Sequence, residues 1–149
     1  MKRTRRILYA TDFSSASRRA FDTALAMARS LNASLTIAYV LAPVVTVPDQ
    51  YIDAATYDRL DRQAREWSTE QLVRLARRAR KAGVKATSVL RDGDPAEQIV
   101  RACRANRADL IVVGTHGRRG LPKFFLGSVA ERVVSMAACP VVTVRGKSS

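Results

Sequence analysis

The chain has 149 residues, a length that suits one compact domain and leaves no room for two full cores. Its hydrophobic share of 47% and charged share of 26% exclude a disordered tail, a collagen-like rod and a membrane-spanning protein. Because 26 Lys and Arg stand against 13 Asp and Glu, the net charge is +13, which favours an anionic partner such as a nucleotide, a nucleic acid or a membrane surface.

The first half of the chain predicts two strands and two helices. An apolar run over residues 7–10 is typical of a buried strand, and apolar residues at helical spacing then predict a helix over residues 14–31. A β-branched and aromatic run over residues 35–40 predicts the second strand, and two prolines mark the loop after it. A long helical pattern over residues 56–82 ends at Gly83.

Local signals suggest how these two helices begin and pack. The first can be capped by Asp12, Ser14 or Ser15. The second is expected to bury one face, with Trp67 as its packing anchor. That face comprises Tyr57, Leu60, Ala64 and Trp67.

A strong helix start signal follows the third predicted strand, which covers residues 84–90. Asp94 is an acidic cap, Pro95 stands in the first turn, and Glu97 lies three residues after the cap. The apolar side of the helix that follows is formed by Ile99, Val100 and Cys103.

Two strands and one helix complete the pattern. Residues 109–113 predict a fully buried strand that runs into Gly114. Residues 128–136 predict the last helix, and residues 140–144 predict the closing strand. The last helix is expected to turn three side chains inward, namely Val129, Val133 and Met136.

The alternation of strands and helices predicts an α/β fold with an open parallel sheet and helices on both faces. Residues 1–149 are therefore expected to form a single domain. In such sheets, ligands bind at the carboxyl ends of strands where the strand order reverses. The candidate site therefore lies in the loops after the first and fourth strands, at residues 11–14 and 114–128.

The second of these loops has the composition of a phosphate-binding segment. Its glycines permit close backbone approach to a phosphate, and the helix that begins at Ser128 offers N–H groups at its positive end. Arg118, Arg119 and Lys123 add positive charge to the same loop. A polyphosphate ligand is the interpretation that this pattern favours.

Two common phosphate-binding motifs do not fit. Gly146-Lys147-Ser148 imitates the end of a Walker A motif, but the first glycine and the following helix are missing. The first strand ends in Ala10-Thr11-Asp12 and not in GxGxxG, which argues against a nicotinamide dehydrogenase.

The cysteines and the basic start of the chain give no further motif. Cys103 and Cys139 form no CxxC pair, so they are interpreted as small core residues and not as part of a zinc-binding or redox motif. The apolar run after the basic start is too short for a signal peptide, and no transmembrane segment is predicted. We therefore expect a cytoplasmic protein that does not associate with a membrane.

The spacing of the glycines after the fourth predicted strand resembles that of a known family. Gly114 and Gly117 are separated by two residues, and Gly127-Ser128 follows after nine more. This is the G2xG9xG(S/T) signature of the ATP-binding branch of the universal stress protein family. The turn at residues 12–14 and the runs 126–134 and 139–145 are also similar to the family. The resemblance covers nearly the whole chain and implies a Rossmann-like, five-stranded parallel sheet of order 3-2-1-4-5.

The resemblance also implies a ligand and a partner. It implies a homodimer that binds ATP between the ends of strands one and four, with Mg²⁺ or Mn²⁺ held through the phosphates. Residues implied on the adenine and ribose side are Ala10, Thr11, Asp12, Val40 and, beneath the sugar, Val113. Residues implied at the phosphates are Gly114, Gly117, Gly127, Ser128 and Val129. Ala130 departs from the pattern, because many ATP-binding members carry a hydroxyl residue there.

Several residues keep two interpretations. Asp12 can cap the first helix, bind the ligand or do both, and Ser128 can be both a helix cap and a phosphate ligand. His116, the only histidine, is interpreted as a loop residue that shapes the phosphate site together with Arg119. A Ser-His-Asp triad or a histidine metal site would need partners that the sequence does not offer.

Three functions remain open. The first is a regulatory homodimer that binds an adenine nucleotide and signals by its loaded state, paired through the closing strand Val141–Val144, which would otherwise be an exposed sheet edge. The second is a slow ATPase in the same site. The third is a nucleic-acid-binding protein that uses the basic run 74–91. A solvated helix end is the favoured interpretation of that run, because no aromatic residues are interleaved with the bases.

Overall fold

The computed structural model describes residues 3–43, 51–115 and 126–146. Within these ranges, strands and helices alternate along the chain as the sequence predicts, with most boundaries within two residues of the expected ones. The elements are β1 (Arg6–Thr11), α1 (Ser15–Leu31), β2 (Ser34–Leu41), α2 (Ala54–Lys81), β3 (Ala86–Asp92), α3 (Pro95–Ala105), β4 (Leu110–Gly114), α4 (Ser128–Met136) and β5 (Val141–Val144).

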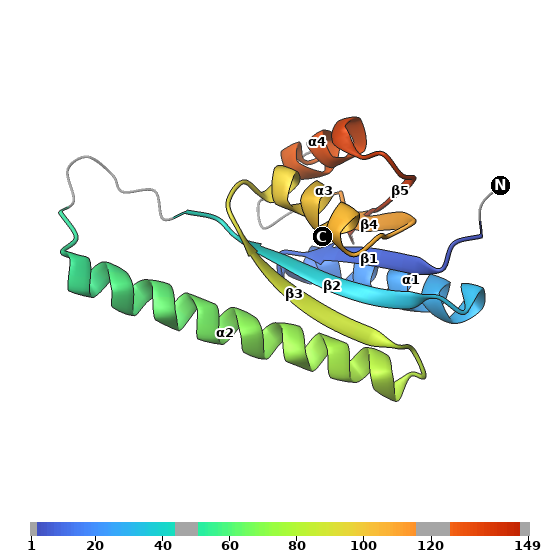
Figure 1. Ribbon diagram of the computed structural model, residues 1–149, viewed down its shortest axis with the longest axis horizontal. Helices are drawn as coiled ribbons and strands as arrows, with labels where there is room; N and C mark the ends of the chain where they lie inside the picture. Colours follow the sequence, from blue (N-terminus) through green and yellow to red (C-terminus); the bar gives the residue numbers. More distant parts are fainter. Residues whose placement is uncertain (1–2, 44–50, 116–125, 147–149) are drawn as a thin grey trace.

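The five strands form one parallel sheet in the order β3-β2-β1-β4-β5 (Figure 1). The predicted Rossmann-like α/β fold and its strand order are therefore confirmed. The chain first builds outward from β1 to β3 and then returns to add β4 on the other side of β1. The order reverses at this point, so the crossover connections leave β1 and β4 toward opposite faces of the sheet.

The helices cover the two faces of the sheet as two pairs. Phe21 and Ala24 of α1 share one core cluster with Leu72 and Ala76 of α2. The other face is covered by α3 and α4, whose buried residues contact alternate side chains of β1, β2 and β4. Ile111 and Val112 are fully buried on opposite faces of β4, as expected for a strand covered on both sides.

The helix starts follow the predicted signals with one exception. Ser14 caps α1 by accepting the Ser17 N–H at 3.2 Å, and Asp94 caps α3 by accepting the Glu97 N–H at 3.0 Å. The prediction that Ser128 caps α4 is wrong. Gly127 occupies the cap position with φ −59° and ψ 152°, its carbonyl accepts the Glu131 N–H at 2.9 Å, and Ser128 is the first helical residue.

The predicted inner face of α4 is also partly wrong. Val129 and Met136 are 38% and 39% exposed, whereas Ala130 and Val133 are buried. The buried side of α4 therefore begins at Ala130, one residue after the predicted Val129. The small Ala130 side chain allows the first turn of α4 to approach the sheet closely.

The N-terminal half of α2 does not bury the face that the sequence predicts. Tyr57, Leu60 and Trp67 are 39%, 42% and 44% exposed, and the residues that α2 buries begin at Ser68. A 28-residue helix is about 42 Å long, whereas a seven-residue strand such as β3 spans about 23 Å. The helix therefore extends beyond the sheet (Figure 1). Trp67 still makes one specific contact, edge-on to the Phe13 ring at 5.3 Å.

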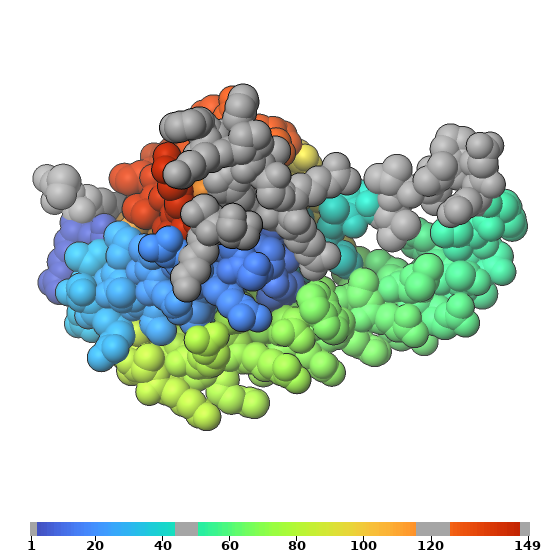
Figure 2. Space-filling view, turned by 180° about the vertical axis from the view of Figure 1, so that it is seen from behind, coloured from blue at the N-terminus to red at the C-terminus, as the bar shows by residue number. Residues whose placement is uncertain are grey.

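The basic segment lies at the other end of α2, where Arg74, Arg77 and Lys81 are exposed. Arg78 differs, because its guanidinium lies 5.1 Å from the centroid of the Phe21 ring of α1, within the range of a cation–π contact. Figure 2 shows this face, with α1 and the C-terminal part of α2 side by side. Nucleic-acid binding by this segment stays a prediction. Among the described ranges, no helix has the length and apolar character that crossing a membrane would require.

Candidate functional site

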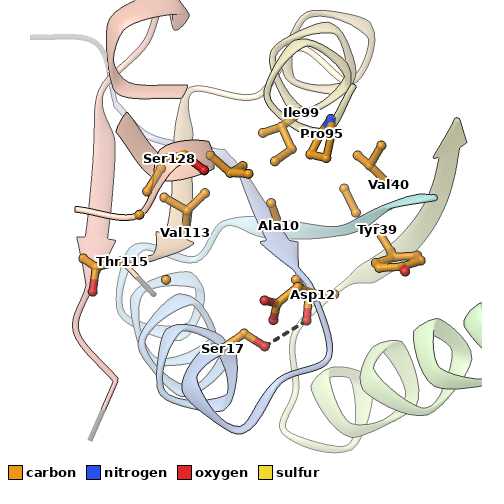
Figure 3. A pocket seen from close by; sticks show the side chains of 16 residues that line it. Ala10, Asp12, Ser17, Tyr39, Val40, Pro95, Ile99, Val113, Thr115 and Ser128 are labelled. Carbon is orange, nitrogen blue, oxygen red and sulfur yellow. Dashed lines mark hydrogen bonds between the residues drawn. The ribbon is translucent and has the colours of Figure 1, made fainter. Parts of the chain in front are cut away.

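A cavity of about 580 Å³ opens at the carboxyl ends of β1 and β4, where the strand order reverses (Figure 3). This is the place that the sheet topology predicts for a ligand. Nine of the residues proposed from the sequence line it: Ala10, Thr11, Asp12, Val40, Val113, Gly114, Gly127, Ser128 and Val129. The other three, His116, Gly117 and Arg119, lie outside the described residues.

Tertiary packing adds lining residues that sequence reasoning missed. Pro95 and Ile99 come from the first turns of α3, and Ala38 and Tyr39 come from β2. The helix start signal at Asp94 located α3 but did not indicate which face would turn to a ligand. Ser17 and Thr115 also line the cavity, and no sequence signal distinguished them from other hydroxyl residues.

One end of the cavity is apolar. Ala10 and Val113 lie on neighbouring strands, with Val40 and Ile99 at the sides (Figure 3). Ala10 is the smallest of these side chains and leaves space where a larger residue would project toward α3. This end can therefore hold a flat, weakly polar group between aliphatic side chains.

The other end of the cavity is polar and is formed by the start of α4. Gly127, Ser128 and Val129 line it, and the N–H groups of a helix's first turn carry partial positive charge. The Gly127 N–H donates to the carbonyl of Thr115 at 2.6 Å, so these two residues lie next to each other beside the cavity. This end suits an anionic group such as a phosphate.

The turn after β1 holds Asp12 at the mouth of the cavity. Asp12 Oδ1 accepts the Ser14 N–H at 2.9 Å, and Thr11 Oγ1 accepts the Phe13 N–H at 2.9 Å. Phe13 has a φ of 61°, a left-handed conformation that these side-chain hydrogen bonds help to stabilise. Asp12 therefore organises the turn, while Ser14 is the residue that caps α1. Figure 3 shows Asp12 beside Ser17 at the end of β1.

A buried hydrogen-bond network supports this turn from below. Ser17 Oγ donates to the Ser14 carbonyl at 3.0 Å and lies 3.1 Å from Thr11 Oγ1. The Tyr9 hydroxyl, which belongs to a side chain only 1% exposed, donates to the Ser17 carbonyl at 2.7 Å. Burial is the main reason why the pKa of Tyr9 is raised, so this hydroxyl stays protonated as a donor. The network fixes the first turn of α1 against β1.

Helices α3 and α4, which form the roof of the cavity with residues that line it, are joined by an ion pair. Arg132 Nη1 of α4 donates to Asp94 Oδ1 at 2.8 Å, and Asp94 is also the cap of α3. The pKa of the Asp94 carboxyl is lowered, first by the hydrogen bond from Arg132 and then by the Glu97 N–H. This pair contributes to the alignment of α3 with α4.

The described lining residues offer one carboxylate, that of Asp12. In the ranges that the structure describes, no group of three or more His, Cys, Asp or Glu side chains is placed to hold a metal ion.

Comparisons with known proteins agree with the fold. Residues 3–145 match the model of the universal stress protein family. A universal stress protein of Methanocaldococcus jannaschii is 34% identical over 95% of this chain and 82% of its own length. A crystal structure of a family protein from Burkholderia pseudomallei is 31% identical, with a TM-score of 0.77, and covers 97% of this chain and 98% of that chain. A universal stress protein crystallised in complex with cAMP is 26% identical, with a TM-score of 0.71, over 98% of this chain and 100% of that chain.

Proposed function

The chain belongs to the universal stress protein family, and we propose that it is a cytoplasmic regulatory homodimer that binds ATP or a related adenine nucleotide. The observation that carries this proposal is the cavity at the switch point, which has one apolar end and one helix N-terminus. The similar protein crystallised with cAMP supports an adenine nucleotide as the ligand class. The proposed signal is the loaded state itself, with at most weak hydrolysis.

The ligand would lie along the length of the cavity. Adenine would occupy the apolar end beside Ala10 and Val40, and the ribose would lie near Asp12 and over Val113. The phosphates would meet the N–H groups at the start of α4 and the Ser128 hydroxyl. Gly117, Arg119 and His116 are proposed to complete the phosphate site. Mg²⁺ or Mn²⁺ would be held through the phosphates.

A substitution at Asp12 tests this assignment. Asp12→Asn keeps an oxygen that can accept the Ser14 N–H but removes the carboxylate charge. A hydrogen bond from a ribose hydroxyl to a carboxylate is worth about 1.5–3 kcal/mol, so we expect the ATP affinity to fall about 10- to 100-fold. Isothermal titration calorimetry with MgATP measures this change.

A matched variant shows whether the loss is local. Asp22→Asn makes the same chemical change on the exposed face of α1, outside the cavity, and is expected to leave ATP affinity unchanged. Equal ATP affinities of Asp12→Asn and the wild type would remove Asp12 from the proposed site. Failure of the wild type to bind any adenine nucleotide would overturn the proposed function.

The homodimer is proposed to form through the edge strand β5. The carbonyls of Pro140 and Val144 accept hydrogen bonds from the N–H groups of Ile111 and Thr115. The backbone groups of Pro140 and Val144 therefore point toward β4. Since the direction of backbone groups alternates along a strand, the N–H of Thr143 points away from β4. An N–H in that position can pair with a second copy of the same strand.

Removing this outward donor tests the dimer. Thr143→Pro deletes the outward N–H but leaves the groups that bond to β4, because proline is tolerated at strand edges. We expect the wild type to sediment as a dimer at micromolar concentration and Thr143→Pro as a monomer, with Thr143→Val still dimeric. Analytical ultracentrifugation measures the masses, and a monomeric wild type would contradict pairing through β5.

A further inference from the structure

The two cysteines of the chain lie side by side although they are 36 positions apart. Their Sγ atoms are 3.4 Å apart, and both residues are thiols. Cys103 lies on the last turns of α3 and is 7% exposed, whereas Cys139 lies between α4 and β5 and is half-buried. The sequence interpretation of both as ordinary core residues does not account for this contact.

The contact is close to the geometry of a disulfide. An S–S bond is about 2.05 Å long, so the two sulfur atoms need to move roughly 1.4 Å closer. Rotation of the Cys139 side chain, which is only half-buried, can supply part of this movement. The surrounding elements are already in place, since Ala102 of α3 and Val133 of α4 belong to the same core cluster.

We propose that Cys103 and Cys139 form a reversible intramolecular disulfide when the protein meets a hydroperoxide. The Cys139 sulfur attacks the peroxide O–O bond and becomes a sulfenic acid, and the peroxide leaves as an alcohol or water. The Cys103 sulfur then attacks the sulfenic sulfur and expels water, which forms the S–S bond. The two thiols are oxidised by two electrons in total, and a dithiol such as thioredoxin can return them.

Burial and hydrogen bonding assign the order of these steps. Burial and the contact with Cys139 raise the pKa of Cys103 to about 12, so this thiol is protonated at neutral pH and protected from the oxidant. Its S–H lies 3.6 Å from the Ala108 carbonyl, which can accept its proton in a hydrogen bond. Cys139 has the solvent access that a peroxide needs. It is therefore the residue that is oxidised first, and Cys103 resolves the intermediate.

The disulfide would join the two helices that form the roof of the cavity. The ion pair between Asp94 and Arg132 already links the start of α3 to α4, and the disulfide would link the end of α3 to the residues just after α4. The start of α3 and the end of α3 would then both be linked to the α4 segment. The inference that this disulfide restrains a bound nucleotide rests on the proposed function. The disulfide itself does not depend on it.

Peptide mass spectrometry of the full chain tests the proposal. After treatment with hydrogen peroxide, we expect both thiols to be lost, the mass to fall by two hydrogen atoms, and a reductant to reverse the change. Trypsin cleaves after Arg101, Arg104, Arg132 and Arg145, so the disulfide would link peptides 102–104 and 133–145. Addition of oxygen without this linked peptide, or a disulfide between two chains, would overturn the proposal.

Two variants separate the roles of the thiols. Cys103→Ser is expected to stop at oxygen adducts on Cys139, and Cys139→Ser is expected to leave Cys103 unreacted at the same peroxide dose. Rapid oxidation of Cys103 in the second variant would overturn the proposed order. The oxidised wild type is expected to melt about 5–10 °C higher than the reduced form, as a disulfide closing a loop of this size predicts, and neither variant should show this rise.

Measurement of the rate of nucleotide release from the reduced and oxidised forms completes the test. We expect slower release of ATP from the oxidised form, by roughly threefold or more, because both roof helices are restrained. Equal release rates would overturn the link to the cavity while the linked peptide still supports the disulfide. If neither form binds a nucleotide, the proposed function fails and the peptide result decides the disulfide alone.

Discussion

Replacing Ala10 by Leu is expected to weaken ATP binding about 100-fold or more while the protein remains folded. Ala10 is the next residue after Leu8 that faces α3 and α4, and its small side chain leaves open the apolar end of the cavity. Leucine would project into that space and occupy the position proposed for adenine. A 100-fold loss corresponds to about 2.7 kcal/mol, the scale of excluding one buried ring from an apolar pocket.

The control for this prediction is Ala26→Leu. Ala26 lies on the exposed outer face of α1, so the same added side chain meets solvent there. We expect ATP affinity to be unchanged in this variant. Calorimetry gives the affinities, and circular dichroism of both variants shows that the fold is kept. If Ala10→Leu bound ATP as tightly as the wild type, adenine could not lie at the apolar end of the cavity.

The second large effect concerns stability. Phe21→Ala is expected to lower the free energy of unfolding by about 3–5 kcal/mol, and Tm by about 10 °C, because it leaves a cavity in the core beneath α1. Phe21 is 1% exposed, its ring centroid lies 5.6 Å from that of Tyr9, and Arg78 of α2 covers its face. Removing the ring therefore weakens packing on β1 and the contact between α1 and α2.

This prediction also separates stability from binding. Phe21 belongs to the core cluster beneath α1 and α2 and does not line the cavity, so below its melting temperature Phe21→Ala is expected to bind ATP within about twofold of the wild type. Urea unfolding measures the stability loss, and Phe21→Leu, which keeps much of the volume, should lose less than half as much. A loss below about 1 kcal/mol for Phe21→Ala would contradict the described packing.

Ala10→Leu and Phe21→Ala together distinguish the two faces of the sheet, one proposed to bind the ligand and one that stabilises the fold. The α1 and α2 face contains the large aromatic side chains that stabilise the fold. The α3 and α4 face contains small residues, such as Ala10, Ala38 and Ala130, that leave room for a ligand. A variant library divided by face should therefore separate into binding defects and stability defects.

Much of the fold could be predicted because local patterns agree with the tertiary structure. The run around Ile111 is apolar on both faces of the strand, which only a sheet covered on both sides tolerates. Asp94 and Pro95 marked the start of α3 because a helix start has local requirements for a side-chain acceptor and for a residue without an N–H. The strand order was not local information and came from the family resemblance.

The candidate site was predictable in part for the same reason. Glycine spacing and the end of β1 pointed to the loops at the switch point, where Asp12 and Gly127 indeed lie on one cavity. The contributions of Ile99 and Tyr39 were not predictable, because an apolar residue on a helix or a strand looks the same whether it faces the core or a cavity. Trp67 and Val129 were misjudged since helical periodicity identifies a face but not what covers it.

The sequence by itself predicted the α/β alternation and most of the helix starts, and it indicated the loop that we propose to meet a phosphate, since each depends on residues close together in the chain. Only the tertiary structure decided which side chains meet across the sheet. It placed Cys103 beside Cys139 and Thr11 beside Ser17, and it left half of α2 beyond the sheet. Contacts between distant segments depend on the lengths and packing of whole elements, which no short pattern contains.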